Sequence, residues 1–152
     1  MKLLKSFGFA FSGILNALRN ETNFLIHTVA AISVIWFARV YGLAPMQLAP
    51  LVLVICLVMV GELLNTAVEA MVDIISPERC RLAKIAKDSA AGAVLILAAG
   101  AVVLAFLTFS DKDRLLNVLE YITKYYPFII AYIALCAVYI FLPRSGSTKE
   151  GK

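Results

Sequence analysis

Several residue types that commonly carry chemistry are scarce in this chain of 152 residues. It contains one histidine, His27, and three widely spaced cysteines without a C-x-x-C pair. These cysteines support neither a disulfide framework nor a zinc site, and the lone histidine argues against a histidine-dependent lipid phosphatase. The sequence also lacks G-x-x-x-x-G-K-[ST], G-x-G-x-x-G and H-R-D motifs. The common soluble kinase designs therefore do not fit.

Charged residues are few as well, at 16% of the chain, whereas hydrophobic residues make up 62%. This balance is typical of an integral membrane protein rather than of a soluble one. Four apolar runs reach the length of about 17 residues or more that a membrane span requires. They cover residues 24–41, 48–75, 89–109 and 125–142.

The sequence thus predicts an all-α membrane protein with an N-terminal interfacial amphipathic helix, three core transmembrane helices and a fourth C-terminal span. The interfacial helix is expected before the first span, where lysines and apolar residues mix and no signal-peptide cleavage signature is present. We divide the chain into a membrane domain, an additional amphipathic segment with the fourth span, and a disordered cytoplasmic tail. These parts cover residues 1–110, 111–143 and 144–152.

Basic residues indicate the orientation of the spans. Lys2, Lys5 and Arg19 precede the first span, and a basic segment at residues 79–87 connects the second span to the third. The positive-inside rule places both on the cytoplasmic side, together with the N-terminus and the tail. Topology and anionic lipid headgroups account for the net charge of +4, so no nucleic acid partner is expected.

A polar stripe interrupts the second apolar run. Its members, separated by three, four and four residues, are Glu62, Asn65, Glu69 and Asp73. On a helix they fall within an arc of about 80°, on one side. Each carboxylate at bilayer depth costs roughly 2.5 to 3.5 kcal/mol even on the lenient insertion scale, so the stripe must face protein, water or ions. It therefore indicates a functional site.

The stripe needs a partner, and Lys87 with Asp88 is the best candidate, at the start of the next apolar run. Together these groups suggest metal and phosphate chemistry. A helix break is expected before the basic segment, which would then form a short helical turn. This turn could cradle nucleotide phosphates or serve topology alone. Glu21, ahead of the first span, is either a further carboxylate ligand or a solvated interfacial acid, and His27 is interpreted as an interfacial hydrogen-bonding residue.

Three other interpretations of the stripe compete with this one. Polar residues can join membrane helices by hydrogen bonding, although three acids on one face are excessive for that purpose. A small cation transporter or channel would use the acids as an ion pathway, but it gives no reason for the basic loop that ends in Lys87 and Asp88. A non-catalytic membrane adaptor leaves the cost of the acids unexplained.

The motifs GELLNTAVEAMVD and AKDSAAGAVL, with NETNFLIH upstream, closely resemble the prokaryotic diacylglycerol kinase and undecaprenol kinase family. The likeness extends over about residues 6–107. It implies a lipid kinase of the bacterial inner membrane that uses ATP and Mg²⁺ to phosphorylate a membrane lipid alcohol. It also implies a homotrimer with an interfacial helix and three spans per subunit, whose active sites form between neighbouring subunits and face the cytoplasm.

The resemblance also implies roles for individual residues. Glu62 matches the proposed general base, and Glu21 and Glu69 match the magnesium ligands. The residues that match those organising the site and the nucleotide phosphates are Asn65, Lys87 and Asp88. The residues that fall where the family contacts ATP are Glu78, Arg79 and Cys80.

Two departures from the family pattern stand out. His27 lies where the enterobacterial diacylglycerol kinases carry a glutamate, and histidine there looks like the undecaprenol kinase branch, which leaves the lipid acceptor open. The segment after residue 110 is absent from the three-span members. It forms either a fourth span at the periphery of the trimer or a hairpin in the interface.

Overall fold

The computed structural model describes residues 2–76 and 80–141, and within these ranges the chain is helical without strands. Four of the five described helices, α2 to α5, are long and apolar enough to cross a membrane. The predicted all-α membrane class, with a fourth span, is therefore confirmed. The five helices are α1 (Lys2–Asn20), α2 (Thr22–Val40), α3 (Pro45–Ile75), α4 (Arg81–Thr108) and α5 (Lys112–Phe141).

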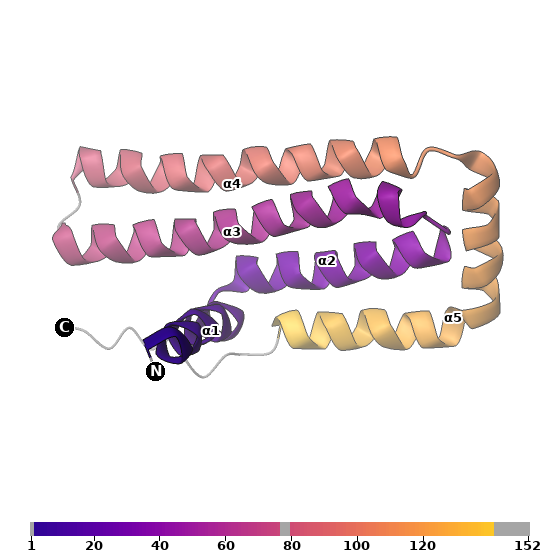
Figure 1. The fold of residues 1–152 in the computed structure, drawn as a ribbon, viewed down its shortest axis with the longest axis horizontal. Helices are drawn as coiled ribbons and strands as arrows, with labels where there is room; N and C mark the ends of the chain where they lie inside the picture. The colour runs from indigo at the N-terminus through magenta and orange to yellow at the C-terminus, as the bar shows by residue number, and fades with distance from the viewer. Residues whose placement is uncertain (1, 77–79, 142–152) are drawn as a thin grey trace.

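The three core spans lie side by side, with α3 between α2 and α4 (Figure 1). The most extensive contact joins α3 to α4. Gly61 contributes to it, because a Cβ atom there would lie only 2.7 Å from Leu97 Cδ1. The missing side chain thus lets the two helices approach closely, as small residues do in membrane bundles.

Helix α1 packs against the end of this layer, where it contacts α2 and α3. It is strongly foreshortened in Figure 1, since it runs across the direction of the spans. Ala17 is its only buried residue, and apolar side chains such as Leu4 and Phe9 are exposed. A lipid surface is the environment that suits such a helix, and its location at the membrane interface remains a prediction.

The connection between α3 and α4 differs in one respect from the expectation. Helix α3 ends at Ile75 with Ser76 as its C-cap, where the sequence indicated a break. The basic residues from Arg81 onward do not form a separate turn, because they are the first turns of α4 itself. Lys87 and Asp88 are consequently carried on the same continuous helix as the third span.

A tight turn reverses the chain between α2 and α3. Gly42 adopts a φ of 76°, in the left-handed region. Its N–H donates to the Arg39 carbonyl at 3.2 Å, and the Leu43 N–H donates to the Ala38 carbonyl at 3.1 Å. This pair of bonds is a Schellman motif, which satisfies carbonyls at the end of α2. The turn therefore fixes α2 and α3 as antiparallel neighbours.

Helix α5 changes direction within its length. Tyr125 has non-helical angles (φ −114°, ψ 18°), two residues before Pro127. The first half runs across the end of the bundle, and the second half returns beside α2 (Figure 1). At the start of α5, the Asp111 N–H donates to the Tyr41 hydroxyl at 2.8 Å. The kink lies at the boundary that the sequence predicts between the amphipathic segment and the fourth span, which is expected from residue 125. The predicted tail at residues 144–152 lies outside the described residues.

Replacing Gly42 with alanine should destabilise the protein. A left-handed conformation costs a residue with a Cβ roughly 1 to 2 kcal/mol, so Gly42→Ala should lower the midpoint of thermal unfolding in detergent. Gly92→Ala is the matched control, because a Cβ there meets nothing within 4 Å. It should leave the midpoint unchanged or raise it slightly. Equal midpoints for the two variants would contradict this account of the turn.

Candidate functional site

Glu62 is the centre of the candidate site. It is 4% exposed, and it is the one buried charged residue among those that the structure describes. The imidazole of His27, on α2, lies beside it, with 3.1 Å between His27 Nε2 and Glu62 Oε1. A buried carboxyl group is costly unless it has a polar partner, and the imidazole of His27 is that partner. The pair also ties α2 to α3 at this level.

One turn further along α3, Asn65 and Glu69 interact. The Asn65 side-chain N–H donates to Glu69 Oε1 at 3.0 Å. Asn65 Oδ1 is buried and has no hydrogen-bond partner among the described residues. An unsatisfied buried acceptor costs about 1 to 3 kcal/mol. This oxygen is therefore available to a donor or a cation from outside the described chain.

Carboxylates from two elements meet near Glu62. Glu21 is the N-cap residue of α2, and its side chain makes no capping hydrogen bond. Both Glu21 and Glu69 lie close enough to Glu62 to repel it electrostatically. These oxygen donors suit a hard cation such as Mg²⁺. Among the described residues, however, no three His, Cys, Asp or Glu side chains surround a common metal position. Further oxygens would have to complete such a site.

The last member of the stripe pairs with α4. Lys87 Nζ donates to Asp73 Oδ1; the Lys87 side chain is partly exposed and the Asp73 side chain is exposed. The expectation that the stripe has a partner in Lys87 is thus confirmed. Asp88 follows on the exposed side of α4. These groups lie near the start of α4, whose N-terminal end favours anions.

Cys80 forms the N-cap of α4. Its Sγ accepts a hydrogen bond from the Ser76 hydroxyl at 3.5 Å and another from the Ala83 N–H at 3.3 Å. The bond from Ser76, followed by that from Ala83, lowers the pKa of this exposed thiol. Glu78 and Arg79, which were predicted beside it, lie outside the described residues.

An apolar groove of about 210 Å³ begins at His27 and is lined by α2, α3 and α4. Small side chains dominate its walls, among them Ala30 and Ala31 on α2 and Ala98 and Ala101 on α4. The sequence did not predict this groove, because it depends on how the three helices pack. It also did not predict the His27–Glu62 pair, although it did identify His27 as a hydrogen-bonding residue.

Comparison with known proteins places the chain among membrane kinases. The family described as prokaryotic diacylglycerol kinase matches residues 8–109. A diacylglycerol kinase from Synechocystis is 47% identical over 102 residues, which are 66% of this chain and 58% of that protein. The alignment thus covers less than two thirds of that relative's length. No solved structure matches the chain significantly.

Two further relatives are named for different lipid substrates. An undecaprenol kinase from Bacillus subtilis is 38% identical over 111 residues, 73% of this chain and 90% of that protein. A diacylglycerol kinase from Escherichia coli K12 is 32% identical over 108 residues, 71% of this chain and 85% of that protein. All three alignments are shorter than this chain, and the match to the family ends before α5 begins.

Proposed function

Since this chain belongs to the prokaryotic diacylglycerol kinase family, we propose that it is a membrane lipid kinase. It transfers the γ-phosphoryl group of ATP to the hydroxyl of a membrane lipid alcohol, either diacylglycerol or undecaprenol. Relatives bear both substrate names, so the two acceptors are equal candidates. The observation that carries the proposal is the buried Glu62 carboxylate, which is held by His27 inside a span. The product would enter phospholipid synthesis or the recycling of a lipid carrier.

In this proposal Glu62 is the general base. The lipid hydroxyl gives its proton to the Glu62 carboxylate as its oxygen attacks the γ-phosphorus. The bond from that phosphorus to the β,γ-bridging oxygen breaks at the same time, and ADP leaves. His27 is a positioning residue, because its hydrogen bond fixes the orientation of that carboxylate. The apolar groove that begins at His27 would hold part of the lipid tail while the hydroxyl remains beside Glu62.

The nucleotide would lie between α3 and the start of α4. Mg²⁺, held by Glu21 and Glu69, would neutralise charge on the phosphate oxygens. Asn65 anchors Glu69 and offers its unpaired Oδ1. The residues assigned to the phosphates and the rest of the nucleotide are Lys87, Asp88, Glu78, Arg79 and Cys80. Lys87, now paired with Asp73, would act as a point charge on the phosphoryl group.

The finer assignments of membrane and assembly are part of the proposal. The basic residues near α1 and the start of α4 favour a cytoplasmic site in the bacterial inner membrane. A homotrimer with sites between subunits is consistent with the incomplete set of ligands that the described residues of one chain place around Glu62. A cation transporter is less well supported, because Lys87 beside Asp73 would repel a passing cation.

Glu62→Gln should abolish most of the kinase activity. Glutamine keeps the size of the side chain but cannot take up the hydroxyl proton, so kcat should fall about a hundredfold to ten-thousandfold. The measurement is transfer of labelled phosphate from ATP, with Mg²⁺, to diacylglycerol and to undecaprenol in parallel. Glu120→Gln, an exposed acid on α5, is the matched control and should retain full activity. Wild-type protein that phosphorylates neither lipid would refute the proposed function.

The role of His27 as a positioning residue can be tested by comparing the effects of its substitution on kcat and on the KM for ATP. His27→Phe leaves the carboxylate without its donor, so kcat should fall about tenfold or more while the KM for ATP stays constant. His27→Gln, which retains an N–H donor, should recover part of the loss. Equal activity of the two variants would show that the hydrogen bond to Glu62 does not matter.

Cys80 offers a test of the nucleotide position. In a variant that keeps Cys80 alone (Cys56→Ser, Cys136→Ser), ATP with Mg²⁺ should slow alkylation by iodoacetamide, whereas sulfate at equal ionic strength should not. The thiolate is the reacting form. Ser76→Ala should therefore slow alkylation near neutral pH, because it removes the hydrogen bond that lowers the pKa of Cys80. Unchanged alkylation with ATP would remove Cys80 from the nucleotide site.

A further inference from the structure

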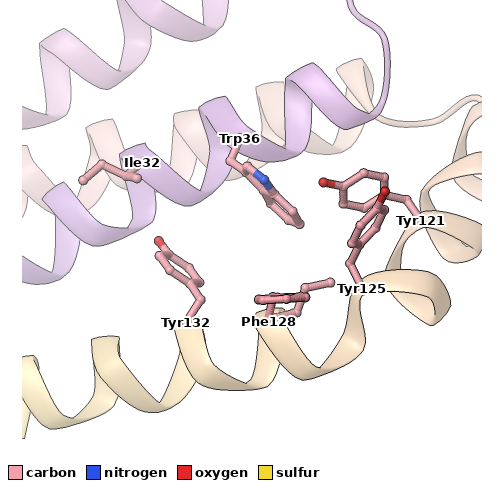
Figure 2. A pocket seen from close by; sticks show the side chains of 7 residues that line it. Ile32, Trp36, Tyr121, Tyr125, Phe128 and Tyr132 are labelled. Carbon is pink, nitrogen blue, oxygen red and sulfur yellow. The ribbon is translucent and has the colours of Figure 1, made fainter.

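A second cavity, lined by aromatic rings, lies between α2 and the kinked helix α5 (Figure 2). Its volume is about 480 Å³, within the range of roughly 300 to 1,000 Å³ that is common for ligand sites. Helix α5 follows the family match, so most of this lining is additional to the kinase domain. The lining residues are Ile32, Trp36, Tyr121, Tyr125, Phe128, Ile129 and Tyr132.

The walls of this aromatic cavity are held in place by contacts between the rings. Trp36 meets Tyr121 edge-on with 5.9 Å between ring centroids, and Tyr121 lies 4.6 Å from Tyr125. On the other side, the Tyr132 hydroxyl is 3.0 Å from the Ser33 hydroxyl of α2. Figure 2 shows Trp36 pointing from α2 toward α5, with Tyr121 and Tyr125 at the corner. The cavity is therefore formed before any ligand arrives.

The chemistry of the side chains that line the aromatic cavity favours a hydrocarbon chain as its ligand. Its surface is almost entirely apolar, so water would find few hydrogen-bond partners inside. An empty space of this size would forfeit dispersion contacts along every wall. The cavity is open at its surface, since the lining residues Trp36 and Phe128 are both exposed. In a membrane, an acyl chain of a neighbouring lipid can enter from that side.

A positive charge lies beside one of the lining rings. The Lys124 ammonium lies 5.5 Å from the centroid of the Tyr125 ring, and the side chain is exposed. Lys124 forms no ion pair with any residue that the structure describes. Tyrosines near a lysine at the corner of α5 are typical of the interface between lipid chains and headgroups. Charge and apolar volume together match an amphiphile with an anionic head.

We propose that this aromatic cavity binds an anionic glycerophospholipid of the leaflet opposite the Glu62 site. One acyl chain occupies the space between α2 and α5, and the phosphate lies against Lys124. The lipid would thus complete the packing of α5, whose returning half otherwise relies on α2 alone among the described helices. This inference does not depend on the kinase reaction.

Trp36 makes the proposal directly testable, because it is the only tryptophan of the chain. Phosphatidylglycerol and phosphatidylcholine with brominated acyl chains would be added in turn to the purified full chain in nanodiscs, and quenching of Trp36 fluorescence measured. Quenching by phosphatidylglycerol should saturate at low mole fraction. Lys124→Gln should raise the half-saturating mole fraction about fivefold, whereas Lys112→Gln, an exposed lysine away from the cavity, should not.

A second variant separates the cavity from the bulk bilayer. Ile32→Phe narrows the space and should raise the half-saturating mole fraction, while Ile26→Phe, on an exposed position of the same helix outside the lining, should leave it unchanged. Non-saturable quenching that is equal for both lipids would overturn the proposal, and so would saturation without preference for phosphatidylglycerol. If protection of Trp36 from quenching grew with the protein-to-lipid ratio, a second copy of the chain would occupy the cavity instead of a lipid. That result would also overturn the proposal.

Discussion

The cost of holding a carboxylate inside a membrane span is the constraint on which the candidate site depends. Glu62 is buried in α3, and His27 is the polar side chain that lies beside its carboxyl group. Because His27 belongs to α2, the two helices must pack at this level, and the turn at Gly42 sets them antiparallel so that they can. A requirement of one side chain thus governs the packing of two spans.

Much of this architecture was predictable because helical periodicity and hydropathy are local properties. The spacing of Glu62, Asn65, Glu69 and Asp73 placed them on one side of α3, and the structure joins two of them directly. The apolar runs predicted the spans, and the pairing of Lys87 with the stripe followed from their shared end of the bundle. The chemical roles assigned to these residues came from the family resemblance and remain predictions.

The rest could not be predicted because it depends on contacts between distant segments. Nothing near His27 in the sequence indicates that its ring meets Glu62 across a helix interface. The course of α5 depends on the backbone of Tyr125, and the aromatic cavity on where α5 then lies against α2. The basic residues from Arg81 onward were expected to form a separate turn, because their polarity does not indicate that the helix of the third span already includes them.

The fourth span also decides on which side of the membrane the chain ends. After three crossings a polypeptide ends on the side opposite its start, whereas the returning half of α5 brings this chain back toward the end of the bundle where α1 lies (Figure 1). Four crossings would leave both flanks of the membrane region on the same side of the bilayer. In the proposed orientation, the end of α5 would therefore lie on the side from which ATP approaches, rather than across the bilayer from it.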